Sequence, residues 1–445
     1  MVKGNVQGLA GPYIRRSVMR KLTPRHDIMT STLPVEIWQL ILEHALIFHP
    51  FFATDPVADS TGNRYDTEIS DWLKTNRGWG EELHRQRLVL RLVCHSWKTF
   101  VDRPEIKLRF GRMKDIGILS LRTSVAELIQ ARRIEAPHHN NIALAQPILD
   151  ALKHEDTIFK AEIITYVTAS TSVFILDSHP GAFPQLKSLH FDLTEDYPIH
   201  ARWVAETFAK ISRHFPSMVF LYLEVDIVRF SSEDVLWLQS LTTLVITSSV
   251  YLLQGLSFDN WSLPSLHHLK IGMFENVEEL RSLLGALSHL GRGLKSLDVE
   301  VEDVDETDAM VSRLWSDCPR LESLRFPMTL LIAHPPSHNQ HPLRYLISSE
   351  CDPRGSCWCT VIGWLPGDFT STLISFCNTL SNLVVVRDSH DWTSVRFRDL
   401  GEDEGNFRIK SDKESCLQMV ETAVRIKALN MTVRFEDVNE KTWEI

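Results

Sequence analysis

A short frame of leucines that recurs through the second half of the chain constrains the fold more than any other feature. The frame is L-x-x-L-x-Φ, where Φ is usually apolar, and it is clear in FPQLKSLHFDL, LPSLHHLKIGM and CPRLESLRFPM. A strand of this pattern turns its leucines to one side and cannot bury them alone, so neighbouring repeats must stack around one continuous core. The central apolar position of the frame is predicted at Leu189, Leu221, Leu244, Leu269, Leu297, Leu324, Leu346 and Leu383.

The interval between repeats indicates which architecture the frame resembles. Consecutive central leucines are 22 to 37 residues apart, and most intervals fall within the roughly 20–29 residues of a leucine-rich repeat. The chain therefore resembles a degenerate leucine-rich-repeat solenoid over residues 181–390, with short strands that form a curved sheet. Residues 199–215 and 276–290 have helical periodicity and are predicted to form the convex side.

The residues on either side of each central leucine are predicted to line the concave face, because side chains alternate along a strand. They mix apolar, hydroxyl and charged groups, which suits a protein partner better than a phosphate polymer. The candidates for contact with a protein substrate are Tyr222, His268, Lys270, Asp298 and Arg325.

Two segments near the N-terminus predict helices with an unusually wide apolar surface. LPVEIWQLILEHAL at residues 33–46 places Pro34 and Glu36 in the first turn, where both favour a helix N-terminus. The second segment spans residues 87–102 and contains RLVCHSWKTFVD at residues 91–102. In each helix the apolar residues cover about 240° of the circumference. Either the helices are buried nearly all round, or one face of each is left for a partner.

These two segments resemble the two ends of an F-box, which opens with Leu-Pro-x-Glu and closes with a Val-Cys-x-x-Trp helix. The match lies within residues 30–105 and falls on Leu33, Pro34, Glu36, Ile37, Ile41, Val93, Cys94, Ser96 and Trp97. The resemblance implies docking on a Skp-family adaptor and, through it, on a cullin scaffold in an SCF ubiquitin ligase, while the repeats hold a protein substrate. It assigns the adaptor contact to Leu33, Pro34, Ile37, Ile41, Val93 and Trp97.

The two ends are farther apart than the F-box pattern has them. Leu33 and Trp97 are separated by 64 residues, which indicates an insert over about residues 48–86. Its Pro50, Pro56 and Gly62 predict a loop. The insert either emerges harmlessly between the two helices or displaces the middle of the motif and weakens adaptor binding. In the second case the chain is a protein-binding scaffold with a degenerate F-box, outside any ligase.

Composition and motifs argue against several other functions. The formal charge is −10 and the pI is about 6.0, so there is no basic field to attract nucleic acid. No run of 18 apolar residues predicts a membrane span. There is no phosphate-binding glycine loop and no hydrolase motif, so we expect a receptor subunit without catalytic residues or cofactor. An unrecognised enzyme or metal protein is the third alternative.

Seven cysteines without a framework spacing suit a reducing compartment, which predicts a cytoplasmic or nuclear protein. Three of them, Cys351, Cys357 and Cys359, are close together in sequence. A zinc site there needs a fourth ligand from Cys377, His341 or His390, at spacings that match no common zinc motif. Exposed thiols or one reversible disulfide are the alternatives.

The predicted fold class is α+β or α/β, with a small helical F-box followed by the solenoid. Residues 1–29 form a basic leader, which is interpreted as disordered, as a presequence or as a nuclear-import patch. Residues 106–180 are expected to be a helical linker that leads into the solenoid. Residues 391–445 are expected to cap its far end, with a strand near residues 429–435.

Overall fold

The computed structural model describes most of the repeat region and a few residues before it. The described residues are 53–58, 68–69, 72, 98, 129–135, 157–167, 175–176, 178, 181–193, 201–225, 235–247, 258–274, 277–301, 309–337, 340–349, 369–387 and 433–436. All of them belong to one compact unit, residues 47–445. The predicted F-box ends apart from Lys98, the basic leader and Cys351, Cys357 and Cys359 lie outside the described residues.

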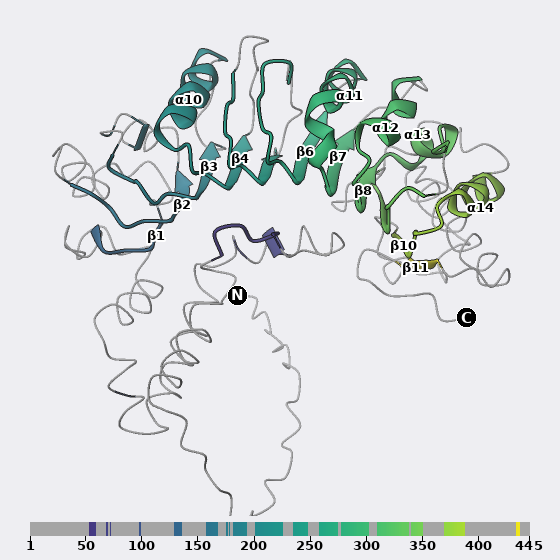
Figure 1. Ribbon diagram of the computed structural model, residues 1–445, viewed down its shortest axis with the longest axis horizontal. Helices are drawn as coiled ribbons and strands as arrows, with labels where there is room; N and C mark the ends of the chain where they lie inside the picture. Colours follow the sequence, from purple (N-terminus) through teal and green to yellow (C-terminus); the bar gives the residue numbers. More distant parts are fainter. Residues whose placement is uncertain are drawn as a thin grey trace, which may run out of the picture. The chain divides into compact units, whose positions relative to one another are not determined.

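The described residues form an eleven-stranded parallel sheet in which every strand lies beside its neighbour in the sequence (Figure 1). The strands are β1 (Arg133–Glu135), β2 (Ile163–Val167), β3 (Ser188–Leu193), β4 (Phe220–Val225), β5 (Thr243–Thr247), β6 (His268–Phe274), β7 (Ser296–Val301), β8 (Ser323–Phe326), β9 (Tyr345–Ser348), β10 (Val385–Arg387) and β11 (Arg434–Glu436). Sequential order with parallel pairing is the topology of a solenoid, because each repeat contacts only its neighbours.

Helical segments join these strands on one side of the sheet (Figure 1). The α-helices are α10 (Ala201–His214), α11 (Val277–Leu290), α12 (Leu314–Asp317), α13 (Met328–Ala333) and α14 (Phe369–Thr379), and the short 3₁₀ turns are η3 (Gly291–Gly293) and η4 (Ala309–Arg313). The helices α10 and α11 lie within residues 199–215 and 276–290, the two ranges where the periodicity predicted helices. No helix among the residues described above is long and apolar enough to cross a lipid bilayer.

One hydrogen-bond arrangement recurs where successive strands begin. The carbonyl of Lys187, just before β3, accepts the N–H groups of Val219 at 2.8 Å and Phe220 at 3.0 Å. The same two-to-one arrangement is repeated at the carbonyls of Glu162, Val219, Thr242, His267, Lys295, Glu322 and Arg344. The junction sets the register between neighbouring repeats, so equivalent residues of consecutive strands lie side by side.

The central leucines form the core on the side of the sheet that carries the helices. They pair in register along one ladder and are buried from Leu189 through Leu346. Helix α10 adds Phe208 and Ile211 to this core, and α11 adds Leu283 and Leu287. The described residues therefore form a solenoid of the leucine-rich-repeat type, in agreement with the fold class predicted for this part of the chain.

The prediction for the last repeat was wrong by three residues. Val386, rather than Leu383, pairs with Leu346 in the central ladder. Leu383 takes the first position of the frame, because its N–H bonds to the carbonyl of Leu380 as that of Leu186 bonds to Phe183. Leu380, Leu383 and Val386 are apolar and three residues apart, so the pattern alone did not distinguish between the two phases.

The sheet extends beyond both limits predicted for the repeats. In β1 and β2 the central positions are Ile134 and Ile164, which pair with each other and continue to Leu189. The first position of the frame is alanine in both, Ala131 and Ala161, which hid these repeats in the sequence. At the other end β11 pairs with β10.

Candidate protein-binding face

The side of the sheet opposite the core, here called the outer face, carries the residues predicted to line the concave face. Its side chains stand in two rows, because equivalent residues pair across parallel strands. The first row includes Ile163, Ser188, Phe220, Thr243, His268, Ser296, Ser323 and Tyr345; the second includes His190, Tyr222, Val245, Lys270, Asp298, Arg325 and Ile347.

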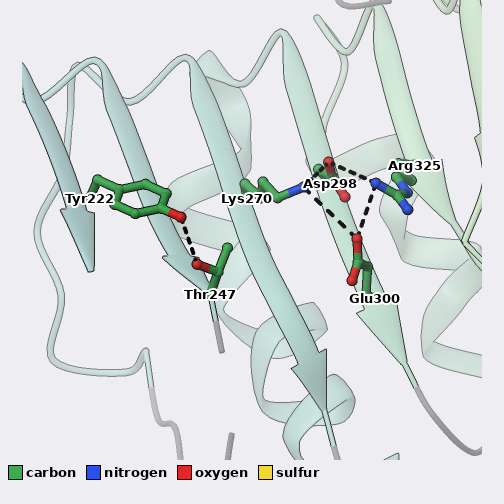
Figure 2. Close-up of polar contacts among 6 residues, drawn as sticks. All are labelled: Tyr222, Thr247, Lys270, Asp298, Glu300 and Arg325. Atoms are coloured by element: carbon green, nitrogen blue, oxygen red, sulfur yellow. Dashed lines mark hydrogen bonds and ion pairs between the residues drawn. The ribbon is translucent and has the colours of Figure 1, made fainter. Parts of the chain in front are cut away.

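Four charged side chains on β6, β7 and β8 form one cluster on this face (Figure 2). The Nζ atom of Lys270 lies 3.0 Å from Oδ2 of Asp298 and 3.9 Å from Oε1 of Glu300. The Nη1 atom of Arg325 lies 3.0 Å from Oε1 of Glu300 and 3.8 Å from Oδ2 of Asp298. The side chains of Lys270 and Asp298 are 10% and 7% exposed, so their attraction is screened less than that of a surface pair. Two positive and two negative charges make the charged cluster neutral.

The repeat geometry explains why these side chains meet. Lys270, Asp298 and Arg325 occupy the same position in three consecutive strands, and their alternating charges attract across the ladder. Glu300 follows Asp298 by two residues and therefore lies on the same face. Sequence reasoning selected the first three but not Glu300, which the two-residue alternation of a strand was sufficient to identify.

An aromatic row precedes the charged cluster along the second row. Ring centroids are 5.0 Å apart between Tyr166 and His190 and 4.6 Å apart between His190 and Tyr222. The hydroxyl of Tyr222 lies 3.0 Å from that of Thr247 (Figure 2). Burial lowers the pKa of His190, although the carboxylate of Glu224 is 3.7 Å away and opposes the shift. The His190 ring is therefore neutral at physiological pH.

Tyr166 has a backbone conformation that is uncommon for a bulky residue. Its φ angle is 59°, in the left-handed region, and it lies where the register of β2 shifts between Ile164 and Val167. Strained backbone of this kind persists only where the surrounding structure holds it, and it is enriched at functional sites. The shift places Tyr166 against His190 at the start of the aromatic row.

His268 lies in the first row, between Thr243 and Ser296. Its pKa is lowered to about 4, chiefly by burial and to a lesser extent by the charges of His267 and Lys295. The ring is therefore neutral at pH 7 and contributes shape and hydrogen bonding to the outer face instead of charge.

Part of the predicted insert lies on the outer face, on the side of the sheet opposite the helices (Figure 1). This part, residues 53–58, 68–69 and 72, is called the docked segment below. Asp55 Oδ2 accepts hydrogen bonds from the hydroxyls of Thr242 at 2.5 Å and Thr243 at 2.9 Å. A small buried apolar cluster joins the docked segment to the sheet through Val57, Ile69, Trp72, Ile163, Phe220, Tyr222 and Val245. The chain's own residues thus pack against β2, β4 and β5.

The five residues predicted to contact a substrate fall into three settings. Lys270, Asp298 and Arg325 belong to the charged cluster. Tyr222 packs in the apolar cluster with the docked segment, and His268 lies between the two. The residues assigned to the adaptor contact, Leu33, Pro34, Ile37, Ile41, Val93 and Trp97, lie outside the described residues, and their role stays a prediction.

Two of the residues considered as a fourth zinc ligand are held in the core of the solenoid. The Nε2 atom of His341 is 3.1 Å from the carbonyl oxygen of Cys318, and its Nδ1 accepts the N–H of Leu343 at 3.3 Å. Burial raises the pKa of Cys377 to about 12, so its thiol stays protonated. Within the described ranges, no three His, Cys, Asp or Glu side chains are grouped so as to hold a metal ion.

Comparisons with known proteins show similarity at the level of structure and not of sequence. No protein-family model matches the chain, and no curated protein is significantly similar to it in sequence. Among solved structures, the leucine-rich repeat-containing protein LegL7 from Legionella pneumophila aligns with 72% of this chain and 88% of its own, at 12% identity and a TM-score of 0.34. The fold assignment rests on the strand register and repeat interval of the chain itself.

Proposed function

We propose that this chain is the substrate-recognition subunit of an SCF-type ubiquitin ligase. An F-box in residues 30–105 docks on a Skp-family adaptor and thereby on a cullin scaffold, and the outer face of the repeat sheet binds a protein substrate. The observation that carries the proposal is the combination of two F-box-like ends, at residues 33–46 and 91–102, with a repeat solenoid in the same chain.

The chemistry of the outer face supports a protein as the ligand of the repeats. Aromatic rings, hydroxyls and the charged cluster, whose positive and negative charges balance, lie next to one another along a single sheet. Tyrosine and arginine are enriched where proteins bind proteins, and a charged cluster in which the positive and negative charges balance does not favour a polyanion. The receptor acts by proximity, because it raises the effective concentration of its substrate beside the ligase.

The adaptor contact is tested by co-purification of the full chain with its Skp-family adaptor and cullin. We expect the native chain to retain both, and a variant with Leu33→Ala, Pro34→Ala and Trp97→Ala to lose both. Trp237→Ala is the matched control, because Trp237 is 59% exposed and belongs to the repeats. That control should bind like the native chain. Failure of the native chain to bind the adaptor would refute the ligase proposal.

A protein-binding scaffold with a degenerate F-box is the second candidate. The long insert between the two F-box-like ends favours it, because part of that insert is engaged with the repeat sheet. A native chain that binds the adaptor but brings no cullin with it supports this candidate. A native chain that binds its protein partner through the repeats and no adaptor also supports it.

A further inference from the structure

The docked segment contacts the sheet as a peptide ligand contacts a receptor. Its contacts come from a few side chains, and the apolar cluster that they form is separate from the main core on the other face of the sheet. The two sides of the contact are far apart in sequence: Asp55 and Thr242 are separated by 187 residues.

A local turn holds the first part of the docked segment in shape. The Oδ1 atom of Asp55 accepts the N–H of Val57 at 3.1 Å, and the N–H of Ala58 points to the carbonyl of Asp55 at 3.4 Å. Pro56 lies between them and restricts the backbone further. An Asp-Pro-Val turn of this kind loses little conformational freedom on binding, which favours recognition of a short peptide.

The sheet supplies a polar pocket for the carboxylate of this turn. The other carboxylate oxygen of Asp55 accepts the two hydroxyls of Thr242 and Thr243. The hydroxyl of Ser188 donates to the backbone carbonyl of Thr54 next to it. These hydroxyls belong to the sheet or its entry turns, so the repeats hold them in place before a ligand arrives.

An apolar pocket for an aromatic ring adjoins the polar one. The Trp72 ring meets Phe220 edge to face at a centroid distance of 4.9 Å, and the guanidinium of Arg133 lies 4.9 Å from its centroid. The indole N–H donates to the carbonyl of Ala53 at 3.1 Å, which ties the ring to the start of the segment. Trp72 and Val57 are completely buried in this arrangement.

We infer that the outer face over β1 to β5 is a peptide-binding site that the chain's own docked segment occupies in cis. The site takes a partner peptide with an Asp-Pro-Val-like turn, whose carboxylate meets the two threonine hydroxyls, together with an aromatic side chain that packs on Phe220 and Arg133. Such a peptide competes with the docked segment. This inference stands on the cis contacts and does not require the F-box resemblance.

The test uses a fluorescein-labelled peptide of residues 50–75 and two forms of the full chain. One form is native; the other carries Asp55→Ala, Val57→Ser and Trp72→Ala, which loosen the docked segment and leave the sheet intact. We expect fluorescence anisotropy to show binding to the loosened chain that is at least about tenfold tighter than to the native chain, because the cis segment competes at high effective concentration. A peptide with Trp72→Ala should not bind.

Two controls make the result decisive. Thr243→Val in the loosened chain keeps the side-chain shape and removes one hydroxyl, so it should weaken peptide binding about tenfold. If the triple variant does not fold by circular dichroism, Asp55→Ala and Trp72→Ala are compared singly. Equal affinity for the native and loosened chains, or no binding to a folded loosened chain, would overturn the inference.

Discussion

Removal of the Asp298 carboxylate is the most direct perturbation of the outer face. In Asp298→Ala, Lys270 loses an ion pair at 3.0 Å, while its longer contact with Glu300 at 3.9 Å is retained. Loss of one partner of a buried pair costs about 3–5 kcal/mol, because the remaining charge is left without compensation in a poorly solvated site. Glu300 still lies 3.0 Å from Arg325, so we expect the lower end of that range, about 3 kcal/mol.

Urea unfolding, followed by both circular dichroism and tryptophan fluorescence, measures this loss. Coincident curves from the two probes establish a single transition, from which the free energy of unfolding is obtained. We expect the loss to change little between about 0.1 M and 1 M salt, because buried pairs are screened much less than exposed ones.

Two further variants separate the effect of charge from that of packing. Asp298→Asn keeps the shape and one hydrogen-bond acceptor, so it should be destabilised less than Asp298→Ala. Lys270→Met combined with Asp298→Leu replaces the pair with apolar groups of similar volume. The free energy of unfolding of this double variant should lie within about 1 kcal/mol of the native value. If the free energy of unfolding of Asp298→Ala lies within about 0.5 kcal/mol of the native value, the pair is solvated in solution, and the prediction from a buried ion pair is wrong.

Four other outcomes follow from the structure. Leu297→Ala removes a central leucine that is 0% exposed and should cost about 3 kcal/mol in the same urea assay; a loss below about 1 kcal/mol would contradict the central ladder. Because burial lowers the pKa of His268 from 6.5 to about 4, the unfolded chain binds the proton more readily, so up to about 3 kcal/mol of stability is lost as the pH falls through this window. His268→Gln should remove this pH dependence of the free energy of unfolding. If NMR shows that the His268 ring of the folded chain titrates near pH 6.5, the lowered pKa is refuted. Burial raises the pKa of Asp55 above its ordinary 3.8, so docking of residues 53–58 on the sheet should weaken as the pH rises through the raised value. Hydrogen exchange at residues 53–58, corrected for intrinsic rates, should then become faster in the native chain. Asp55→Asn should not show this change. Burial raises the pKa of both Cys318 and Cys377 to about 12, so neither should react with iodoacetamide at pH 8 until the chain unfolds; mass spectrometry that finds either labelled in the folded chain would contradict their burial.

Much of the repeat sheet was predictable from the sequence, because its signal is local. A central leucine with an apolar residue two positions on defines a strand with one buried side, and the regular interval defines stacking. Seven central leucines, from Leu189 to Leu346, lie in the predicted ladder. The alternation also identified Lys270, Asp298 and Arg325 as outer-face neighbours, although not the ion pairs that they form.

The prediction was incomplete where the local pattern was weak or ambiguous. Ala131 and Ala161 replace the first leucine of the frame, so β1 and β2 left no leucine signal. Around Val386, apolar residues recur every three positions and fit two phases of the frame. Only the pairing of Val386 with Leu346 distinguishes the two.

By itself, the sequence determined that this chain contains stacked repeats with a leucine core and a mixed polar face. It also contains the two F-box-like ends on which the proposed ligase role depends. Only the tertiary structure decided what covers that polar face. The insert carries the composition of a loop, yet its Asp55 binds hydroxyls 187 and 188 residues away, and Trp72 packs on Phe220. Such contacts join residues that are far apart in the sequence and become neighbours only when the repeats have folded. Sequence periodicity reports local structure, so it does not identify these pairs.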